Sequence, residues 1–290
     1  MSRHVGMTSP RAARGAALIA AAAIAILCIA TQLVPSTSAG FQAKITNSKN
    51  TAATAGYFTC LSALAADKSS ETLSYPLNEA AATTSAADNG SAGTNTGTYR
   101  GAHAITTTTP IACTRDTVNA TVFDGTSSYV SSTTQIANPT TYSLEVWFKT
   151  TVAGGKLIGF GNAQTGASTT YDRELYINSA GAVTFGTYNT AVQTVTSPTA
   201  YNNGAWHQAI ATMSPTTGMA LWLDGTKVAS STTFVNQRSV TGYWRVGYDA
   251  NSVFPLNGAS LYFTGSMRFA SVFTTVLTAA QISNHYAAGR

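Results

Sequence analysis

The chain has 290 residues, and only 9% of them are charged, against about 25% in an average soluble domain. Apolar residues make up 44%, so the chain can form a core and the composition excludes an intrinsically disordered protein. Three of the 16 basic residues, Arg3, Arg11 and Arg14, lie at the N-terminus, and the remaining 13 nearly balance 11 acidic residues. No Lys/Arg cluster is left, which excludes the basic surface of a nucleic-acid-binding protein.

Residues 1–39 have the order of a secretory signal peptide. Basic residues precede an uncharged apolar run at 16–30, and small residues lead up to Ala39. We predict cleavage after Ala39 and a secreted or cell-surface protein. The alternative is an uncleaved membrane anchor, because the run 16–34 nearly reaches the length that spans a bilayer. The chain is predicted to contact a membrane only if this N-terminal segment is uncleaved. Residues 40–72 follow as an N-terminal segment or linker.

The chain has three cysteines, of which Cys28 lies in the predicted signal peptide. Cys60 and Cys113 remain, and an exported pair most simply forms one disulfide. A closed loop of about 50 residues would stabilise the fold by roughly 4 kcal/mol. The alternative is two separate buried thiols, and no spacing typical of a zinc site occurs.

Short strands separated by turn residues fill the chain from residue 122 onwards, a pattern typical of an all-β sandwich. In the segment 142–149 every second residue from Leu144 to Phe148 is apolar, so one face of this strand is buried. Two such apolar layers pack on each other in a sandwich. The predicted strands are 122–123, 129–130, 142–149, 156–161, 174–178, 183–188, 205–213, 219–224, 227–230, 243–248 and 263–273.

Three further segments complete the prediction. A strand begins at 73–79, after a stretch at 61–72 that is either a short helical turn or a linker. Residues 80–100 are rich in Ala, Thr, Ser, Asn and Gly and predict a long surface loop. Near the end, 278–286 predicts a short helix, because Thr278 can cap it and a Gln occupies the capping-box position.

Several motifs follow one another between residues 73 and 288. They are Y-P-L-N-E at 75–79, A-D-N-G at 87–90, G-T-Y-R-G at 97–101, F-D-G-T-S-S-Y-V at 123–130, Y-S-L-E-V-W-F-K at 142–149, W-H at 206–207, L-W-L-D-G at 221–225, F-T-G-S-M at 263–267 and L-T-A-A-Q-I at 277–282. Their order resembles the laminin-G-like, concanavalin A-like lectin and glucanase superfamily, in its bacterial secreted type. The resemblance implies that residues 73–290 form one domain. Its implied fold is a two-sheet antiparallel β-sandwich of jelly-roll type with a short C-terminal helix.

The resemblance also implies an acidic residue in the last strand, where this chain has Arg268. Many relatives hold a structural Ca²⁺ near the sandwich edge, and calcium needs six to eight oxygen ligands. With Arg268 in place and few carboxylates in the chain, we predict no cofactor. Asp88 and Asp124 are the candidate ligands if calcium is bound, and the alternative role for both is to cap turns.

Catalysis is not predicted. Superfamily members that cleave glucans carry an E-x-D-x-x-E run, which is absent here. Asp172 and Glu174 share one side of a strand, as a glycosidase pair would, but Arg173 between them favours a salt-bridged surface. Trp206, His207 and the turn at Asp224 are interpreted as scaffold.

Binding is the predicted function. Sugar-binding faces combine aromatic rings with amides and hydroxyls, and the alternative for each aromatic residue is a place in the core. The predicted ligand-binding residues are Trp222, Tyr176, Tyr188, Trp147, Asn178 and Arg245. The chain is therefore predicted to be a secreted or cell-surface, non-catalytic lectin-like module for carbohydrate or another surface ligand. The alternatives are a structural or adhesive surface protein that engages proteins or self-assembles, and a glycoside hydrolase.

Overall fold

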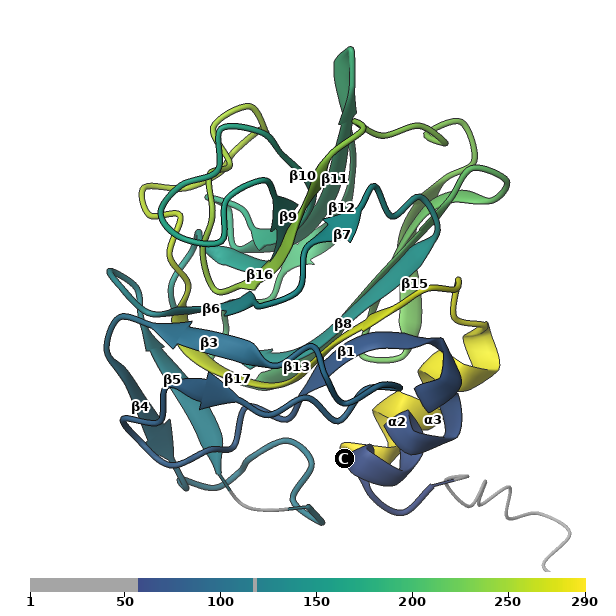
Figure 1. Cartoon of the computed structure of the whole chain (residues 1–290). Helices are drawn as coiled ribbons and strands as arrows, with labels where there is room; N and C mark the ends of the chain where they lie inside the picture. The colour runs from purple at the N-terminus through teal and green to yellow at the C-terminus, as the bar shows by residue number, and fades with distance from the viewer. Residues whose placement is uncertain (1–56, 117–118) are drawn as a thin grey trace, which may run out of the picture. The chain divides into compact units, whose positions relative to one another are not determined.

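The computed structural model of the chain describes residues 57–116 and 119–290. These residues lie within one of the two units of the chain, Thr54–Arg290, and Figure 1 shows their arrangement. The predicted signal peptide or anchor and most of the segment 40–72 lie outside the described residues. Within the described part, no helix has the length and apolar character needed to cross a bilayer.

The first of two antiparallel sheets, called sheet A, has eight strands. They are β1 (Glu71–Tyr75), β4 (His103–Thr106), β5 (Ala120–Asp124), β8 (Tyr142–Lys149), β13 (Trp206–Ser214), β14 (Gly218–Leu223), β15 (Thr226–Ser231) and β17 (Thr264–Phe273). Their order across the sheet is β15-β14-β13-β8-β17-β5-β4, and β1 pairs with the second half of β17.

The second sheet, called sheet B, has nine strands. They are β2 (Ser85–Ala86), β3 (Gly97–Arg100), β6 (Tyr129–Ser132), β7 (Ile136–Ala137), β9 (Lys156–Gly161), β10 (Tyr171–Ile177), β11 (Ala182–Asn189), β12 (Ala191–Ala200) and β16 (Thr241–Val246). The order is β12-β11-β10-β9-β16-β6-β3-β2, with β7 paired to β16.

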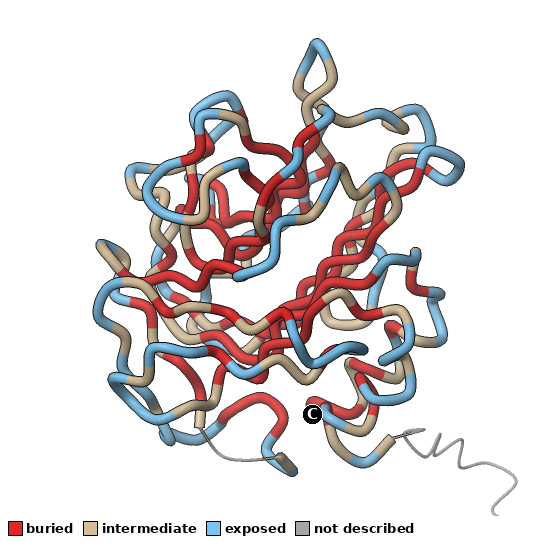
Figure 2. Tube along the Cα trace, viewed as in Figure 1, coloured by how far each residue is buried: buried red, intermediate tan, exposed pale blue. Residues whose placement is uncertain are grey.

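The main core fills the space between the two sheets, where Figure 2 shows the buried residues concentrated. Each strand contributes alternate residues to it. On β8 these are Leu144, Val146 and Phe148, and on β10 they are Leu175 and Ile177, all fully buried. The predicted two-sheet antiparallel sandwich is confirmed.

A second apolar cluster covers the outer face of sheet A, the face turned away from the core. Here α2 (Cys60–Asp67) and α3 (Ala279–Ala288) contact each other and pack on the sheet (Figure 1). The short helix η1 (Lys68–Ser70) leads from α2 into β1. The cluster is formed by Cys60, Leu64, Ala112, Cys113, Trp147, Ile210, Phe269, Phe273, Leu277 and Ile282. The predicted C-terminal helix is confirmed, and Thr278 and Gln281 form its capping box.

A buried polar network ties the two helices to sheet A. His285 of α3 is 2% exposed and lies between two carboxylates, 2.6 Å from Glu145 and 3.0 Å from Asp67 of α2. Burial alone lowers the pKa of His285, but Glu145 and Asp67 outweigh it and raise this pKa to about 9. Burial and the nearby Glu145 raise the pKa of Glu71 to about 8. The helices are therefore fixed by charge as well as by apolar contact.

The structure departs from the predicted elements in several places, since β4 and β7 also form where no strand is predicted. The long surface loop predicted at 80–100 is wrong in part, because β2 and β3 lie within it and Tyr99 of β3 is buried. No strand is predicted at 191–200, where β12 forms the edge of sheet B. Its outward residues face water, so its sequence is polar and Thr-rich and lacks the alternation that identifies a half-buried strand.

Candidate ligand-binding site

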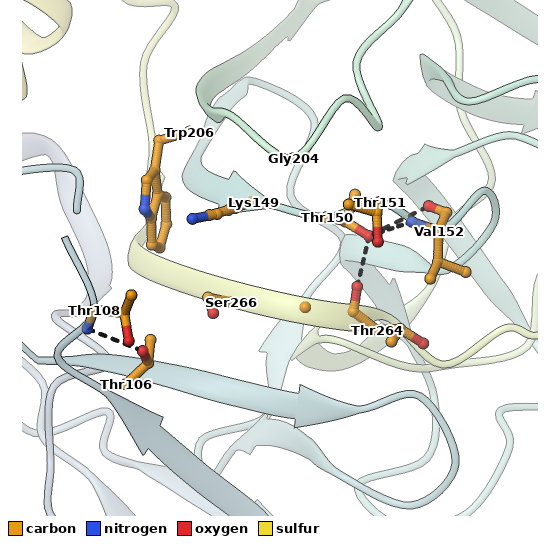
Figure 3. A pocket seen from close by; sticks show the side chains of 11 residues that line it. Thr106, Thr108, Lys149, Thr150, Thr151, Val152, Gly204, Trp206, Thr264 and Ser266 are labelled. Carbon is orange, nitrogen blue, oxygen red and sulfur yellow. Dashed lines mark hydrogen bonds between the residues drawn. The ribbon is translucent and has the colours of Figure 1, made fainter. Parts of the chain in front are cut away.

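Two adjoining pockets open on the outer face of sheet A and share Lys149, Gly204 and Trp206. We call the pair the Trp206 site. The smaller, the threonine pocket, has a volume of about 220 Å³ and is shown in Figure 3. Its remaining lining residues are Thr106, Thr108, Thr150, Thr151, Val152, Thr264, Gly265 and Ser266.

The larger, the aromatic pocket, has a volume of about 420 Å³ and lies on the other side of Trp206. It is mainly apolar, with two more aromatic rings and a second cation. Its remaining lining residues are Pro110, Ile111, Ala112, Thr114, Trp147, Ala205, Tyr286, Gly289 and Arg290.

Strand register places the central residues of the Trp206 site side by side. Trp206 at the start of β13 lies opposite Lys149 at the end of β8, and Lys149 lies opposite Ser266 of β17. Residues paired in this way share one face of a sheet. Their neighbour Phe148 is fully buried in the core, so Trp206, Lys149 and Ser266 face outwards. Figure 3 shows the Lys149 ammonium beside the indole ring of Trp206.

The floor of the threonine pocket depends on the close approach of β17 to the end of β8. The Thr150 hydroxyl donates a hydrogen bond of 2.6 Å to the Thr264 carbonyl oxygen, drawn in Figure 3. Gly265 has φ +137°, and a Cβ there would lie 2.2 Å from the Lys149 carbonyl oxygen. Only glycine fits this position, because a side chain would force the two strands apart.

The segment 107–116, which runs from β4 towards β5, forms the outer wall of the site. The Trp206 indole N–H donates to the Pro110 carbonyl oxygen at 3.1 Å, and the Cys113 amide donates to the Gly289 carbonyl oxygen at 2.9 Å. Cys113 forms the predicted disulfide with Cys60, which is confirmed. The segment is thus tied to β13, α2 and the end of α3.

Arg268 of β17 contacts the wall segment 107–116. It is fully buried, and its guanidinium donates to the carbonyl oxygens of Ala112 and of Cys113, the latter at 3.0 Å. Burial lowers the pKa of Arg268 to about 10, and nearby Asp116 opposes that shift. The arginine that replaces the implied acidic residue therefore holds the disulfide segment against sheet A.

The floor of the aromatic pocket is a stacked ring pair. Trp147 lies almost parallel to Tyr286 of α3, with ring centroids 5.8 Å apart and an angle of 12° between the planes. Trp147 is 3% exposed, and Tyr286 is half-buried. The Arg290 guanidinium lies 5.4 Å from the centroid of the Tyr286 ring. Tyr286 and Trp206 are the aromatic side chains of the pocket that solvent reaches.

The lining of the Trp206 site contains cations, hydroxyls and aromatic rings. Lys149 and Arg290 are its cations, and no described Asp or Glu lines either pocket. Aromatic faces pack on the C–H faces of sugar rings, and hydroxyls and cations bind their polar edges. General acid–base hydrolysis needs two carboxylates, which these linings do not supply. The arrangement is suited to binding.

Four of the six predicted ligand-binding residues lie on the outer side of sheet B, away from the Trp206 site. Tyr176 is fully buried, and its hydroxyl donates to the Pro255 carbonyl oxygen at 2.7 Å. Arg245 is fully buried and donates to two loop carbonyl oxygens. The Asn178 side chain accepts the amides of Ala180 and Ala182 in a turn, and Tyr188 is half-buried under the Arg238 guanidinium.

The other two predicted residues lie on the outer face of sheet A. Trp147 forms the floor of the aromatic pocket. Trp222, half-buried, lines a separate pocket of about 200 Å³. The Lys227 ammonium lies 5.5 Å from the Trp222 ring centroid. The structure therefore brings Trp147 into the Trp206 site and leaves Trp222 outside it.

The carboxylates singled out in the sequence are engaged within the protein. Glu174 is fully buried and forms an ion pair with Lys156. Asp172 is also buried and accepts hydrogen bonds from backbone amides, including those of Tyr188 and Arg238. Burial raises the pKa of Asp172 and that of Glu174, the latter to about 8. Neither carboxylate is placed to reach a polysaccharide.

The two candidate calcium ligands cap turns. Asp88 accepts the amides of Ser74, Gly90 and Asn95. Asp124 accepts the amides of residues 126–128. Slight burial raises the pKa of Asp124, but these bonds and the Ser127 hydroxyl outweigh it and lower this pKa. Asp88 and Asp124 fit the turn-capping role, since their carboxylate oxygens already accept several hydrogen bonds from the protein.

Trp206 and Lys149 are the functional candidates that the sequence patterns miss. One signal for Lys149 is present in the sequence, since it shares strand parity with Trp147. For Trp206 no such signal exists, because its outward direction follows from the register between β13 and β8. That register joins segments almost 60 residues apart in the chain.

Solved structures with the same fold include three that bind ligands or belong to binding domains. Domain 4 of AbnA, a GH43 extracellular arabinanase from Geobacillus stearothermophilus, in complex with arabinotriose, has TM-score 0.52 and 15% identity, over 74% of this chain and 98% of that domain. The binding domain of botulinum neurotoxin DC in complex with SialylT has TM-score 0.52 and 11% identity, over 76% and 51%. The binding domain of Paraclostridial Mosquitocidal Protein 1 has TM-score 0.53 and 10% identity, over 76% and 52%.

This chain spans about half the length of the two toxin binding domains, and at these identities the likeness concerns the fold. No curated protein matches the sequence. The family model described as the concanavalin A-like lectin/glucanases superfamily matches residues 124–283, which is more than half of the 290 residues. The fold, its sandwich topology and this match agree, and the chain belongs to the concanavalin A-like lectin/glucanases superfamily.

Proposed function

We propose that this chain is a non-catalytic, secreted or cell-surface module that binds a saccharide in the Trp206 site. The observation that carries the proposal is the position of Trp206. Its half-buried indole separates two pockets, one lined by threonine hydroxyls and one by aromatic rings. An aromatic face flanked by hydroxyl groups suits a sugar ring, which has C–H faces and hydroxyl edges.

Two further observations support binding without chemistry. No described carboxylate lines the site, whereas a glycosidase needs two carboxyl groups flanking the bond that it cleaves. Asp172 and Glu174, which lie on the same strand β10, are buried in internal contacts. The disulfide and the superfamily fold support an extracellular location. The structures bound to arabinotriose and to SialylT support a saccharide as the ligand class, by analogy of fold.

The test is a glycan array probed with the purified, disulfide-bonded chain and two variants. Trp206→Ala removes the central ring of the site, and Trp222→Ala removes an equally half-buried ring from the same sheet. We expect the chain to bind a defined set of glycans without releasing products. Trp206→Ala should lose this binding at least tenfold, and Trp222→Ala should keep it. An array on which the chain binds no glycan, or an equal loss of glycan binding in both variants, would contradict the proposal.

A further inference from the structure

We infer that the ligand of the Trp206 site is an anionic saccharide, whose carboxylate or sulfate group pairs with Lys149. This inference rests on the proposed function and adds the chemical class of the ligand. It begins from the position of Lys149, a half-buried cation that lines both pockets of the site.

Several buried cations on the outer sides of the sheets lie beside carboxylates. Lys156 forms an ion pair with Glu174, Arg245 lies 3.9 Å from Asp249, and His285 lies between Glu145 and Asp67. Such pairing is expected, because a charge that loses its water must be compensated by a partner. Carboxylates therefore compensate several of the described buried cations.

Lys149 differs from these paired cations in both its exposure and its partners. It is half-buried between Trp206 and the walls of both pockets, and no described Asp or Glu forms an ion pair with it. Figure 3 shows its ammonium group projecting beside the indole ring of Trp206. No described carboxylate compensates this cation in the lining of either pocket.

A ligand that packs on Trp206 covers Lys149 at the same time. A neutral sugar would remove water from the ammonium and return only hydroxyl contacts. An anionic sugar would return a charge-assisted hydrogen bond, which is about twice as strong as a neutral one. Removing water from the site also strengthens the attraction between the two charges. Binding therefore favours a saccharide with an acidic group close to the ring that stacks on Trp206.

The surroundings of Lys149 support the same ligand class. Arg290 adds a second cation to the aromatic pocket, and the described lining of both pockets contains no carboxylate that would repel an anion. Ser266 lies opposite Lys149 on β17 and offers a hydroxyl donor to the same acidic group. The site as a whole is positively charged, although the chain as a whole carries few charges.

The experiment measures the affinity of the full chain for matched saccharide pairs. One arm uses oligogalacturonides and their methyl esters, which differ only in whether the carboxylate is free. A second arm uses sulfated and unsulfated galactan oligomers, so that the two arms distinguish a carboxylate from a sulfate. Each pair is measured at about 0.05 M and about 0.5 M salt, because an exposed ion pair weakens as salt screens it.

The variants are Lys149→Gln, Lys149→Arg and Lys227→Gln. Lys227 also lies beside a tryptophan on sheet A but outside the Trp206 site, so it is a matched control. We expect the acidic member of at least one pair to bind about five- to tenfold more tightly than the neutral member. Lys149→Gln should abolish this preference, while Lys149→Arg and Lys227→Gln should retain it.

Three outcomes would overturn the inference, and they separate it from the proposed function. Equal binding of acidic and neutral members, lost in Trp206→Ala, would refute the anionic ligand and leave the saccharide site standing. A preference that survives in Lys149→Gln would place the anion elsewhere. Failure to bind any saccharide, on these pairs and on the array, would refute both proposals together.

Discussion

Lys149 and Trp206 lie opposite each other at the ends of β8 and β13, and together they form the ridge between the two pockets of the Trp206 site. The pairing results from antiparallel register on a face that the helices leave partly open. Everything else in the site either fixes this pair or surrounds it. The following predictions concern the parts of the fold that keep the pair in place.

Gly265 is expected to control the distance between β17 and β8. In Gly265→Ala the new Cβ would approach the Lys149 carbonyl oxygen to 2.2 Å, and we expect a loss of stability of about 2 kcal/mol or more. Saccharide binding should fall as well, because Lys149 belongs to the displaced strand end. Thermal unfolding followed by circular dichroism measures the first effect, and titration with the array ligand measures the second.

Gly166→Ala is the matched control for that variant. Gly166 also has a positive φ, +66°, but a Cβ there meets no atom within 4 Å. Its substitution therefore reports backbone strain alone, which should cost about 1 kcal/mol. Equal destabilisation by the two substitutions would show that contact with Lys149 is unimportant.

The disulfide is expected to stabilise both the fold and the aromatic pocket. The two cysteines are 53 residues apart, so their removal in the double variant Cys60→Ser/Cys113→Ser should cost about 4 kcal/mol. Because Cys113 belongs to the wall segment 107–116, saccharide affinity should fall at temperatures where the variant is still folded. The measurements are denaturant unfolding and titration. Undiminished affinity in the folded variant would show that Arg268 and Trp206 hold the wall without the disulfide.

Stability should fall as the pH rises from about 5 to about 9. The pKa of His285 is raised to about 9, so the protonated imidazole stabilises the fold fully below pH 6.5 and this contribution disappears as the pH rises through 9. The pKa of Glu71 is raised to about 8, so folding favours its protonated form and stability falls between pH 4.5 and 8. For His285 alone the change amounts to about 3 kcal/mol.

The Tm measured across that pH range checks this prediction. In His285→Gln the Tm should fall less steeply between pH 6.5 and 9, since glutamine does not titrate and only buried carboxyl groups such as Glu71 still contribute to the slope. His103→Gln is the control, because His103 forms no ion pair with the described carboxylates, and its slope should match that of the wild type. A wild-type Tm that rises with pH over this range would contradict the assigned charge network.

Local patterns in the sequence predict much of the fold. The alternation in β8 and the capping residues of α3 are set by neighbours a few positions apart, and both are found as predicted. The edge strand β12 escapes prediction because its outward face needs no apolar residues. The pair β2 and β3 escapes because its polar residues are those of a loop, while only Ala86 and Tyr99 contribute apolar side chains to the core.

The site is harder to predict because it is assembled from distant segments. Tyr176 and Arg245 have the residue types of a binding face, yet loops cover them and they serve internal contacts. Trp206 has the position of a scaffold residue, yet the register with β8 turns it outwards. Strand parity gives the face on which a side chain lies, but only tertiary structure gives what covers that face.

The most direct test of the central claim is a crystal structure of the chain with its tightest array ligand. We predict a sugar ring packed on the Trp206 indole, with a polar group of the ligand within hydrogen-bond distance of Lys149 Nζ. A ligand bound on the outer side of sheet B, or at Trp222, with the Trp206 site filled only by water, would contradict it.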